Sequence, residues 1–208
     1  MPVALSRVVL ATRNVGKLRE LQRLLAGLPF NLVSLAELKL FSPEESGASF
    51  LANALLKARH AAEASGSAAI ADDSGLEVDA LGGAPGIHSA RYAGCKADEH
   101  ANNAKLVAAL QNIPWERRRA RYRCVLVFMR TACDAEPVVA EGVWEGYILD
   151  AARGSGGFGY DPYFWIPDLE MSAAELNLEE KNRHSHRGSA LRGLRERLAL
   201  AGAGRGMI

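Results

Sequence analysis

Two adjacent carboxylates, Asp72 and Asp73, are the residues of this chain best suited to acid–base or metal chemistry. They follow an apolar run that ends at Ala71, and the Ser74-Gly75 pair after them predicts a turn, because glycine accepts backbone angles that other residues avoid. Adjacent side chains of a regular strand point to opposite faces, so both acids can face one ligand only where the strand breaks. Such a pair favours a hard cation, with one Asp left to act as a base. An Asp-rich surface turn is the structural alternative.

A polar turn near the N-terminus is the second candidate site. Residues 8–11 predict a short strand, residues 12–17 (TRNVGK) a turn, and the leucines after it a helix. Thr12 or Asn14 is expected to cap that helix. A helix start suits phosphate, and Lys17 adds a full positive charge. The turn lacks the glycine and the Ser or Thr of a Walker A loop, and an ordinary capped helix with a solvated lysine is the alternative.

A predicted helix over residues 49–64 carries a possible phosphate ligand. Its residues Asn53 and Lys57 share one face, four positions apart. Lys57 is either solvated or directed toward phosphates. The loop before the helix offers two acids, Glu44 and Glu45, which are either residues favoured by the helix dipole or metal ligands from a loop.

Residues 153–162 (RGSGGFGYDP) are dense in glycine, so that the backbone can approach a ligand closely. Phe158 and Tyr160 offer flat faces for stacking a nucleobase. A flexible hairpin loop is the alternative, which the aromatic residues disfavour. Near a later helix start, His186 and Arg187 either donate hydrogen bonds to the oxygens of a base or are solvated.

Length and composition indicate one substantial domain, with or without two lobes. The chain has 208 residues, is 49% apolar and 24% charged, and carries a net charge of +1, which is ordinary for a globular protein and suggests no nucleic-acid or membrane partner. The cysteines Cys95, Cys124 and Cys133 lack metal-site spacing and fit reduced thiols in a cytosolic protein. No transmembrane run or signal peptide is expected.

One basic run, residues 117–123 (RRRARYR), enters a predicted strand at 124–129. Basic residues with one aromatic can grip a nucleic-acid backbone, but a solvated strand entry is the commoner explanation. The remaining elements predicted from periodicity are helices over 98–111, 175–184 and around 191–198, and strands over 30–35, 137–140 and 144–149.

Four motifs in this order and at these separations resemble the inosine/xanthosine triphosphate pyrophosphatase family, which removes non-canonical purine nucleotides. They are TRNVGK at 12–17, ADDSGLEVDALGGAPGIHSARYAG at 71–94, GGFGYDP at 156–162 and KNRHSHRG at 181–188. The resemblance covers the chain from about Val8 to about Leu198.

The resemblance implies an elongated, two-lobed α/β protein with a long central mixed β-sheet flanked by helices and an active-site cleft between the lobes. It implies a single domain over residues 1–200, and residues 201–208 are expected to form a flexible, frayed tail. Members are typically homodimers and convert ITP, dITP or XTP to the monophosphate and pyrophosphate with Mg²⁺. A cytoplasmic enzyme with a nucleotide substrate, and without nucleic-acid or membrane partners, is therefore expected.

The resemblance also assigns roles. Asp73 would bind metal and act as the base toward water, with Asp72 beside it, and Lys57 would face the phosphates. Glu44 matches the other metal carboxylate, with Glu45 as the alternative. The residues implied to bind the triphosphate are Thr12, Arg13, Asn14, Val15, Gly16 and Lys17, with Ser74 touching substrate, and those implied to form the nucleobase pocket are Phe158, Gly159, Tyr160, Asp161, Lys181, His186 and Arg187.

Base selection has a physical explanation within this hypothesis. Inosine and xanthine carry a 6-oxo acceptor where adenine has an amino donor, so donors from His186 or Arg187 would accept the former and reject ATP by as much as about 10⁴-fold. Guanine would have to be rejected at its 2-amino group. Two alternatives are a house-cleaning pyrophosphatase for modified pyrimidine triphosphates and a non-catalytic single-strand-binding module that uses residues 117–123.

Overall fold

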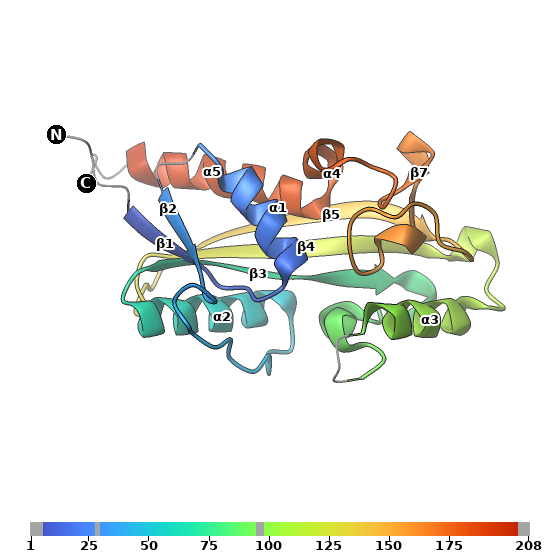
Figure 1. Cartoon of the computed structure of the whole chain (residues 1–208), viewed down its shortest axis with the longest axis horizontal. Coiled ribbons are helices and arrows are strands. Elements are labelled where there is room, and N and C mark those ends of the chain that lie inside the picture. Colours follow the sequence, from blue (N-terminus) through green and yellow to red (C-terminus); the bar gives the residue numbers. More distant parts are fainter. Residues whose placement is uncertain (1–5, 28–29, 95–97, 204–208) are drawn as a thin grey trace. The chain divides into compact units, whose positions relative to one another are not determined.

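The chain forms a mixed α/β structure around one seven-stranded sheet (Figure 1). The computed structural model describes residues 6–27, 30–94 and 98–203. The strands are β1 (Ser6–Leu10), β2 (Phe30–Ser34), β3 (Ala68–Val78), β4 (Arg119–Met129), β5 (Val138–Ile148), β6 (Phe164–Ile166) and β7 (Met171–Ser172). The helices are α1 (Val15–Leu25), α2 (Phe50–Ser65), α3 (Glu99–Leu110), α4 (Leu178–His184) and α5 (His186–Ala203).

The strand order is β2-β1-β3-β4-β5-β6-β7. Strand β1 pairs in parallel with β2 and β3, whereas β5, β6 and β7 pair antiparallel in sequence. The parallel part needs helical crossovers, which α1 and α2 provide, and the antiparallel part needs only short connections. The predicted mixed sheet flanked by helices is therefore confirmed.

The described residues divide into two compact units. Unit 1 contains the described residues of Met1–Asp73, Val125–Glu141 and Ser189–Ile208, and unit 2 contains those of Ser74–Cys124 and Gly142–Gly188. Strands β3, β4 and β5 contribute residues to both units.

Unit 1 is built on strands that are apolar on both faces. Val8, Val9 and Leu10 of β1 are fully buried, as expected for a parallel strand covered on both sides. Figure 1 shows α2 on one face of these strands and α1 with α5 on the other. Helix α2 contributes a stripe of small buried residues that includes Ala54 and Ala58, and small side chains let a helix lie close to a sheet.

Unit 2 has its own apolar core. Leu76 of β3, Tyr122 of β4, Trp144 of β5 and Phe164 of β6 pack together, and Leu106 of α3 joins them. The Tyr122 ring lies 4.6 Å from the Phe164 ring and 6.4 Å from the Trp144 ring, between centroids. These aromatic residues come from separate strands. The candidate site residues of unit 2, described below, pack against them.

Two predicted turns are wrong. The Ser74-Gly75 pair does not break the chain, because β3 runs continuously from Ala68 to Val78. Likewise, the strands predicted over 137–140 and 144–149 are one strand, β5. In both cases pairing with neighbouring strands overrides the local turn propensity of glycine.

The basic run is largely part of β4, and its alternate arginines are ion-paired. Arg119 and Arg121 lie 3.4 Å from carboxylate oxygens of Glu145, and Arg123 lies 3.6 Å from Glu77. Cross-strand pairs of this kind offset part of the positive charge of the run. This geometry supports the strand interpretation over a nucleic-acid-binding cluster.

The C-terminal helix is longer than periodicity predicted. Helix α5 continues to Ala203, so residues 201–203 of the predicted tail are helical, and residues 204–208 lie outside the described residues. The two short strands β6 and β7 were not predicted. None of the described helices combines the length and hydropathy needed to cross a membrane.

Candidate active site

The predicted phosphate turn is a capped helix start. The side chain of Asn14 accepts a hydrogen bond from the backbone N–H of Lys17 at 3.0 Å, and Thr12 Oγ1 accepts one from the N–H of Asn14 at 3.2 Å. Helix α1 therefore begins at Val15, with Gly16 in its first turn. Arg13 and Val15 are exposed, and the Arg13 guanidinium lies 6.0 Å from the Phe41 ring centroid.

Lys17, on this helix, contacts Asp72, the first residue of the acid pair. Its ammonium lies 2.6 Å from Asp72 Oδ1, and the Asp72 side chain is completely buried. A buried carboxylate needs such a partner, because an isolated buried charge is costly. The pair fixes Lys17 at the helix start, where the helix dipole already favours anions.

Lys57 organises the second acid. Its ammonium donates to Asp73 Oδ1 at 2.6 Å, to the Asp72 carbonyl at 2.7 Å and to Glu45 Oε1 at 3.1 Å. The lysine is buried, and its three donors are all used. Because β3 is continuous here, Asp72 and Asp73 point to different lysines. The expected strand break at the acid pair is wrong.

The buried charges shift the pKa values of this cluster. Burial raises the pKa of Asp73 above its ordinary value, and the nearby ammonium groups of Lys57 and Lys17 offset only part of that rise. For Lys57, burial acts to lower the pKa, but the charges of Asp73 and Glu45 outweigh it and raise the pKa above its ordinary value. Asp73 is thus a carboxylate with increased proton affinity, as a general base requires.

Asp73 Oδ2 is buried and has no hydrogen-bond partner among the described residues. A carboxylate oxygen that accepts no hydrogen bond is able to coordinate a metal ion. No group of three or more His, Cys, Asp or Glu residues in the described ranges is placed to hold a metal. Mg²⁺ typically uses one or two carboxylates plus waters and phosphate oxygens, so these residues fit it.

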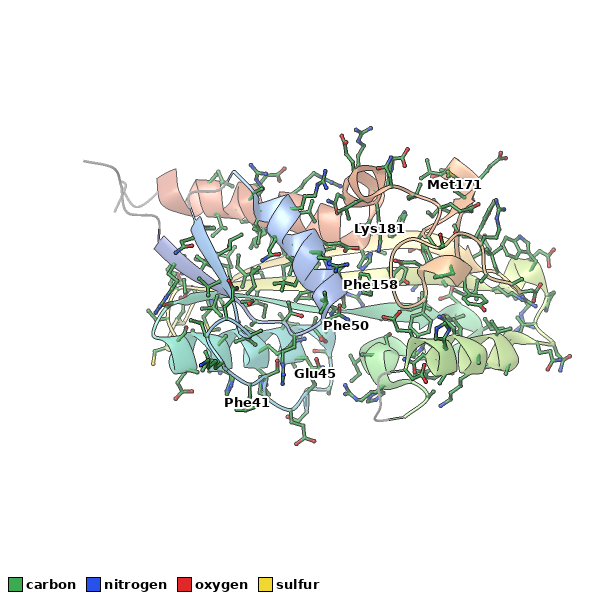
Figure 2. All side chains as sticks on the ribbon, viewed as in Figure 1. Phe41, Glu45, Phe50, Phe158, Met171 and Lys181 are labelled. Carbon is green, nitrogen blue, oxygen red and sulfur yellow. The ribbon has the colours of Figure 1, made fainter. Side chains whose placement is uncertain are left out.

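The two acids of the preceding loop differ in position. Glu45 is half-buried and contacts Lys57, whereas Glu44 is exposed. Figure 2 shows Glu45 on the loop that leads to Phe50 at the start of α2. Of these two loop acids, it is therefore Glu45 that reaches the Lys57–Asp73 pair.

The remaining candidates gather in unit 2 around Asp161. This carboxylate is buried and accepts hydrogen bonds from Lys181 Nζ at 2.6 Å, from the N–H of Phe158 at 2.8 Å and from the Tyr122 hydroxyl at 3.2 Å. A Cβ at Gly157 would lie 2.1 Å from the same carboxylate. Asp161 therefore holds the glycine-rich loop against α4 and the sheet.

Phe158 is flanked by cations. Lys181 Nζ lies 4.6 Å and the Arg187 guanidinium carbon 5.8 Å from its ring centroid, and Figure 2 shows Phe158 and Lys181 side by side. Arg187 is almost fully buried and donates to Ser74 Oγ at 2.8 Å. Three cationic or hydroxyl groups from distant parts of the sequence are therefore brought together.

His186 is a stacked residue of this cluster. Its ring lies 4.7 Å from that of Tyr122 at an interplanar angle of 9°, and it is buried at the start of α5. Ser185 caps this helix by accepting a hydrogen bond from the N–H of Gly188 at 3.2 Å. The alternative of a solvated helix start therefore does not hold for His186 and Arg187, since both are buried.

Sequence reasoning missed several supporting residues. Tyr122 was considered only as part of a basic run. Asn103 of α3 donates to the Gly159 carbonyl at 2.9 Å, and the Tyr160 hydroxyl donates to the Ser89 carbonyl at 2.8 Å. These bonds fix the loop by long-range pairing, for which the local sequence carries no signal.

Comparison with known proteins identifies the family of this chain. The Ham1 family model matches residues 8–197. A protein of Thioalkalivibrio sulfidiphilus named dITP/XTP pyrophosphatase is 57% identical over 92% of this chain and 98% of its own length, and one of Pectobacterium atrosepticum with the same name is 55% identical over 95% and 100%. A HAM1 protein structure from Coxiella burnetii superposes with a TM-score of 0.86 at 43% identity, covering 93% of this chain and 98% of that one. Family model, sequence identity and fold agree over most of the chain, which belongs to the Ham1 family.

Proposed function

We propose that this protein hydrolyses non-canonical purine nucleoside triphosphates, namely dITP, ITP and XTP, to the monophosphate and pyrophosphate. The observation that carries the proposal is the Lys57–Asp73 pair at 2.6 Å, in which Asp73 keeps one buried carboxylate oxygen idle. The names of the relatives, dITP/XTP pyrophosphatase, support the same activity.

The proposed reaction is a displacement at the α-phosphorus. Asp73 accepts a proton from the attacking water, a bond forms between the water oxygen and phosphorus, and the bond to pyrophosphate breaks. A bound Mg²⁺ would offset the charge of the triphosphate and polarise its oxygens. Lys17 and the N-terminus of α1 bind the phosphates, and Lys57 holds Asp73 in place, so the protein supplies mainly positioning and charge stabilisation.

We further propose Asp73 and Glu45, rather than Glu44, as the carboxylates that hold the metal. Glu45 is the acid of the loop that reaches Lys57. Carboxylates that meet at one ammonium group have the charge and spacing that a divalent cation also accepts. Thr12, Asn14 and Gly16 belong to the helix start that receives phosphate, and Arg13 and Val15 are proposed to line its exposed rim.

The second cluster is proposed to bind the nucleobase. Arg187 and Lys181 carry donors suited to the 6-oxo group of hypoxanthine or xanthine, and Phe158 offers a ring for stacking. His186 contributes a ring nitrogen and Ser74 a hydroxyl. Asp161 and the loop residues Gly159 and Tyr160 hold this arrangement in place through the bonds described above.

A cytoplasmic homodimer acting on free nucleotides is part of the same proposal. The ion-paired arginines of β4 and the near-neutral charge of the chain support a small-molecule substrate over nucleic acid.

A panel of triphosphates tests the proposal directly. Pyrophosphate release is measured from dITP, ITP, XTP, GTP, ATP, dUTP and 5-methyl-dCTP with and without Mg²⁺. The expected result is metal-dependent release from dITP, ITP and XTP, with kcat/KM far above that for ATP and GTP. Preference for dUTP or the methylated pyrimidine would replace the purine assignment, and no hydrolysis of any triphosphate would overturn the enzyme assignment.

A further inference from the structure

One face of α2 contacts the preceding loop, residues 41–49, at three points. Asn53, Lys57 and His60 lie at positions i, i+4 and i+7, which share a helix face. Asn53 Oδ1 accepts a hydrogen bond from the loop at 2.8 Å, Lys57 Nζ donates at 3.1 Å and His60 Nε2 lies 3.0 Å from a loop carbonyl. The loop groups that they contact are the N–H of Gly47, the carboxylate of Glu45 and the carbonyl of Phe41.

The contact between Asn53 and Gly47 is the tightest of the three. Asn53 is fully buried. A Cβ on Gly47 would lie 2.6 Å from Asn53 Oδ1 and 2.9 Å from both Ala52 Cβ and the Asn53 backbone nitrogen. The loop therefore approaches the first turns of α2 so closely that only glycine fits, two residues after Glu45.

Asn53 has a structural counterpart in unit 2. Asn102 occupies the fourth position of α3, as Asn53 does in α2, and its Oδ1 accepts from the N–H of Ala93 at 2.7 Å. Asn102 Nδ2 donates to the Ala90 carbonyl at 3.2 Å, whereas Asn53 Nδ2 has no hydrogen-bond partner among the described residues. Both asparagines fasten a preceding loop to a helix, but only the Asn53 loop carries acids at the proposed metal site.

A buried donor that makes no hydrogen bond destabilises the folded protein. If Asn53 served stability alone, an arrangement like that of Asn102, with both amide atoms bonded, would serve it better. The Asn53 side chain therefore contacts the loop through its Oδ1 alone, at the N–H of Gly47.

We propose that Asn53 is a positioning residue for the metal site. It fixes Gly47 and thereby places the Glu45 carboxylate beside Lys57 and Asp73, so that its loss lowers Mg²⁺ affinity more than it lowers turnover at saturating Mg²⁺. The inference rests on the proposed function for its kinetic consequence only. Groups that orient metal ligands typically contribute about 10- to 100-fold to metal affinity or activity.

The test compares Asn53→Ala with Asn102→Ala, which removes the same side chain from the same helical position in the other unit. Two quantities are measured: hydrogen exchange of the 41–49 peptide, and the Mg²⁺ concentration that gives half-maximal dITP hydrolysis. Asn53→Ala is expected to speed exchange in 41–49 and to raise that concentration about 10-fold or more. Asn102→Ala is expected to leave both as in the unsubstituted protein.

A second variant disrupts the same contact by a substitution in the loop. Gly47→Ala inserts a methyl group against Asn53 without requiring an unusual backbone angle, so it is expected to give the same pair of changes. The Asn53→Ala/Gly47→Ala double variant is expected to be no worse in Mg²⁺ dependence than Gly47→Ala alone, because Gly47→Ala already disrupts the contact that Asn53→Ala removes. Gly47→Ala also decides the question if Asn53→Ala does not fold.

Normal Mg²⁺ dependence in Asn53→Ala or Gly47→Ala, with only a lower melting temperature, would show that the contact is merely structural and would overturn the proposal. Failure of the proposed function looks different. In that case the unsubstituted protein releases no pyrophosphate, while exchange in the 41–49 peptide still decides whether Asn53 fixes the loop.

Discussion

Lys57 Nζ lies 2.6 Å from one carboxylate oxygen of Asp73, while the other oxygen of Asp73 is buried with no partner among the described residues. Lys57 thus orients the Asp73 carboxylate by bonding only one of its two oxygens. One oxygen is held and the other is left for a proton or a cation. The catalytic predictions for Asp73 and Lys57 follow from this division.

Replacing Asp73 by Asn is expected to abolish most dITP hydrolysis, because an amide cannot accept the proton from water. General-base catalysis contributes about 10²- to 10⁴-fold, and loss of a proposed metal ligand adds to this. The variant remains folded, since the amide oxygen can still accept from Lys57. kcat for dITP and the far-ultraviolet circular dichroism spectrum are measured together, and near-normal kcat would remove Asp73 from its assigned role.

The pKa of Asp73 provides a second prediction. Burial raises this pKa, and Lys57 opposes the rise, so Lys57→Met is expected to raise the pKa further. In the metal-free protein, the Asp73 carboxyl carbon should therefore titrate by NMR at a pH above that of an ordinary Asp, and at a still higher pH in Lys57→Met.

The same pKa shift predicts the direction in which kcat/KM changes with pH. The ionised carboxylate is the active form, so kcat/KM rises with pH through the Asp73 pKa, and the acid limb of Lys57→Met is displaced to higher pH. Lys39→Met, in which an exposed lysine is removed from outside the cluster, serves as the control. A displacement of the acid limb to lower pH in Lys57→Met would contradict the assigned electrostatics.

Arg187 is expected to contribute to base selection. Its guanidinium is buried beside Phe158 and is held by Ser74, so Arg187→Ala removes a fixed donor. We expect the ratio of kcat/KM for ITP over ATP to fall by at least 10-fold, as is typical for loss of a buried hydrogen bond to substrate. Arg183→Ala, which removes an exposed arginine of α4, is the control, and an unchanged ratio in Arg187→Ala would exclude Arg187 from selection.

The Lys181–Asp161 pair is expected to be a strong determinant of stability in unit 2. Both side chains are almost fully buried, and breaking a buried pair by removing one partner costs about 3–5 kcal/mol. Lys181→Met and Asp161→Asn should each lower the free energy of unfolding by that order. The double variant should lose less than the sum of the two, as measured by urea denaturation, and strict additivity would show that the pair is not coupled.

From the sequence alone, the candidate chemistry-bearing residues could be named and most of the local structure could be predicted. Helices α1, α2 and α3 could be predicted from apolar periodicity and capping residues, because those signals lie within one or two turns of the chain. The acid pair, the capped turn with Lys17, and the aromatic residues of the glycine-rich loop could be identified from residue type. The four motifs then indicated a resemblance to the inosine/xanthosine triphosphate pyrophosphatase family.

Only the tertiary structure decided how these residues are paired. It showed that Asp72 and Asp73 lie on one unbroken strand and face different lysines, that Glu45 rather than Glu44 reaches Lys57, and that Asp161 anchors Lys181. Each of these contacts joins residues that are distant in sequence. Local propensity cannot encode such pairings, because they depend on which strands and helices pack together, and strand pairing also overrode the turn tendency of Gly75.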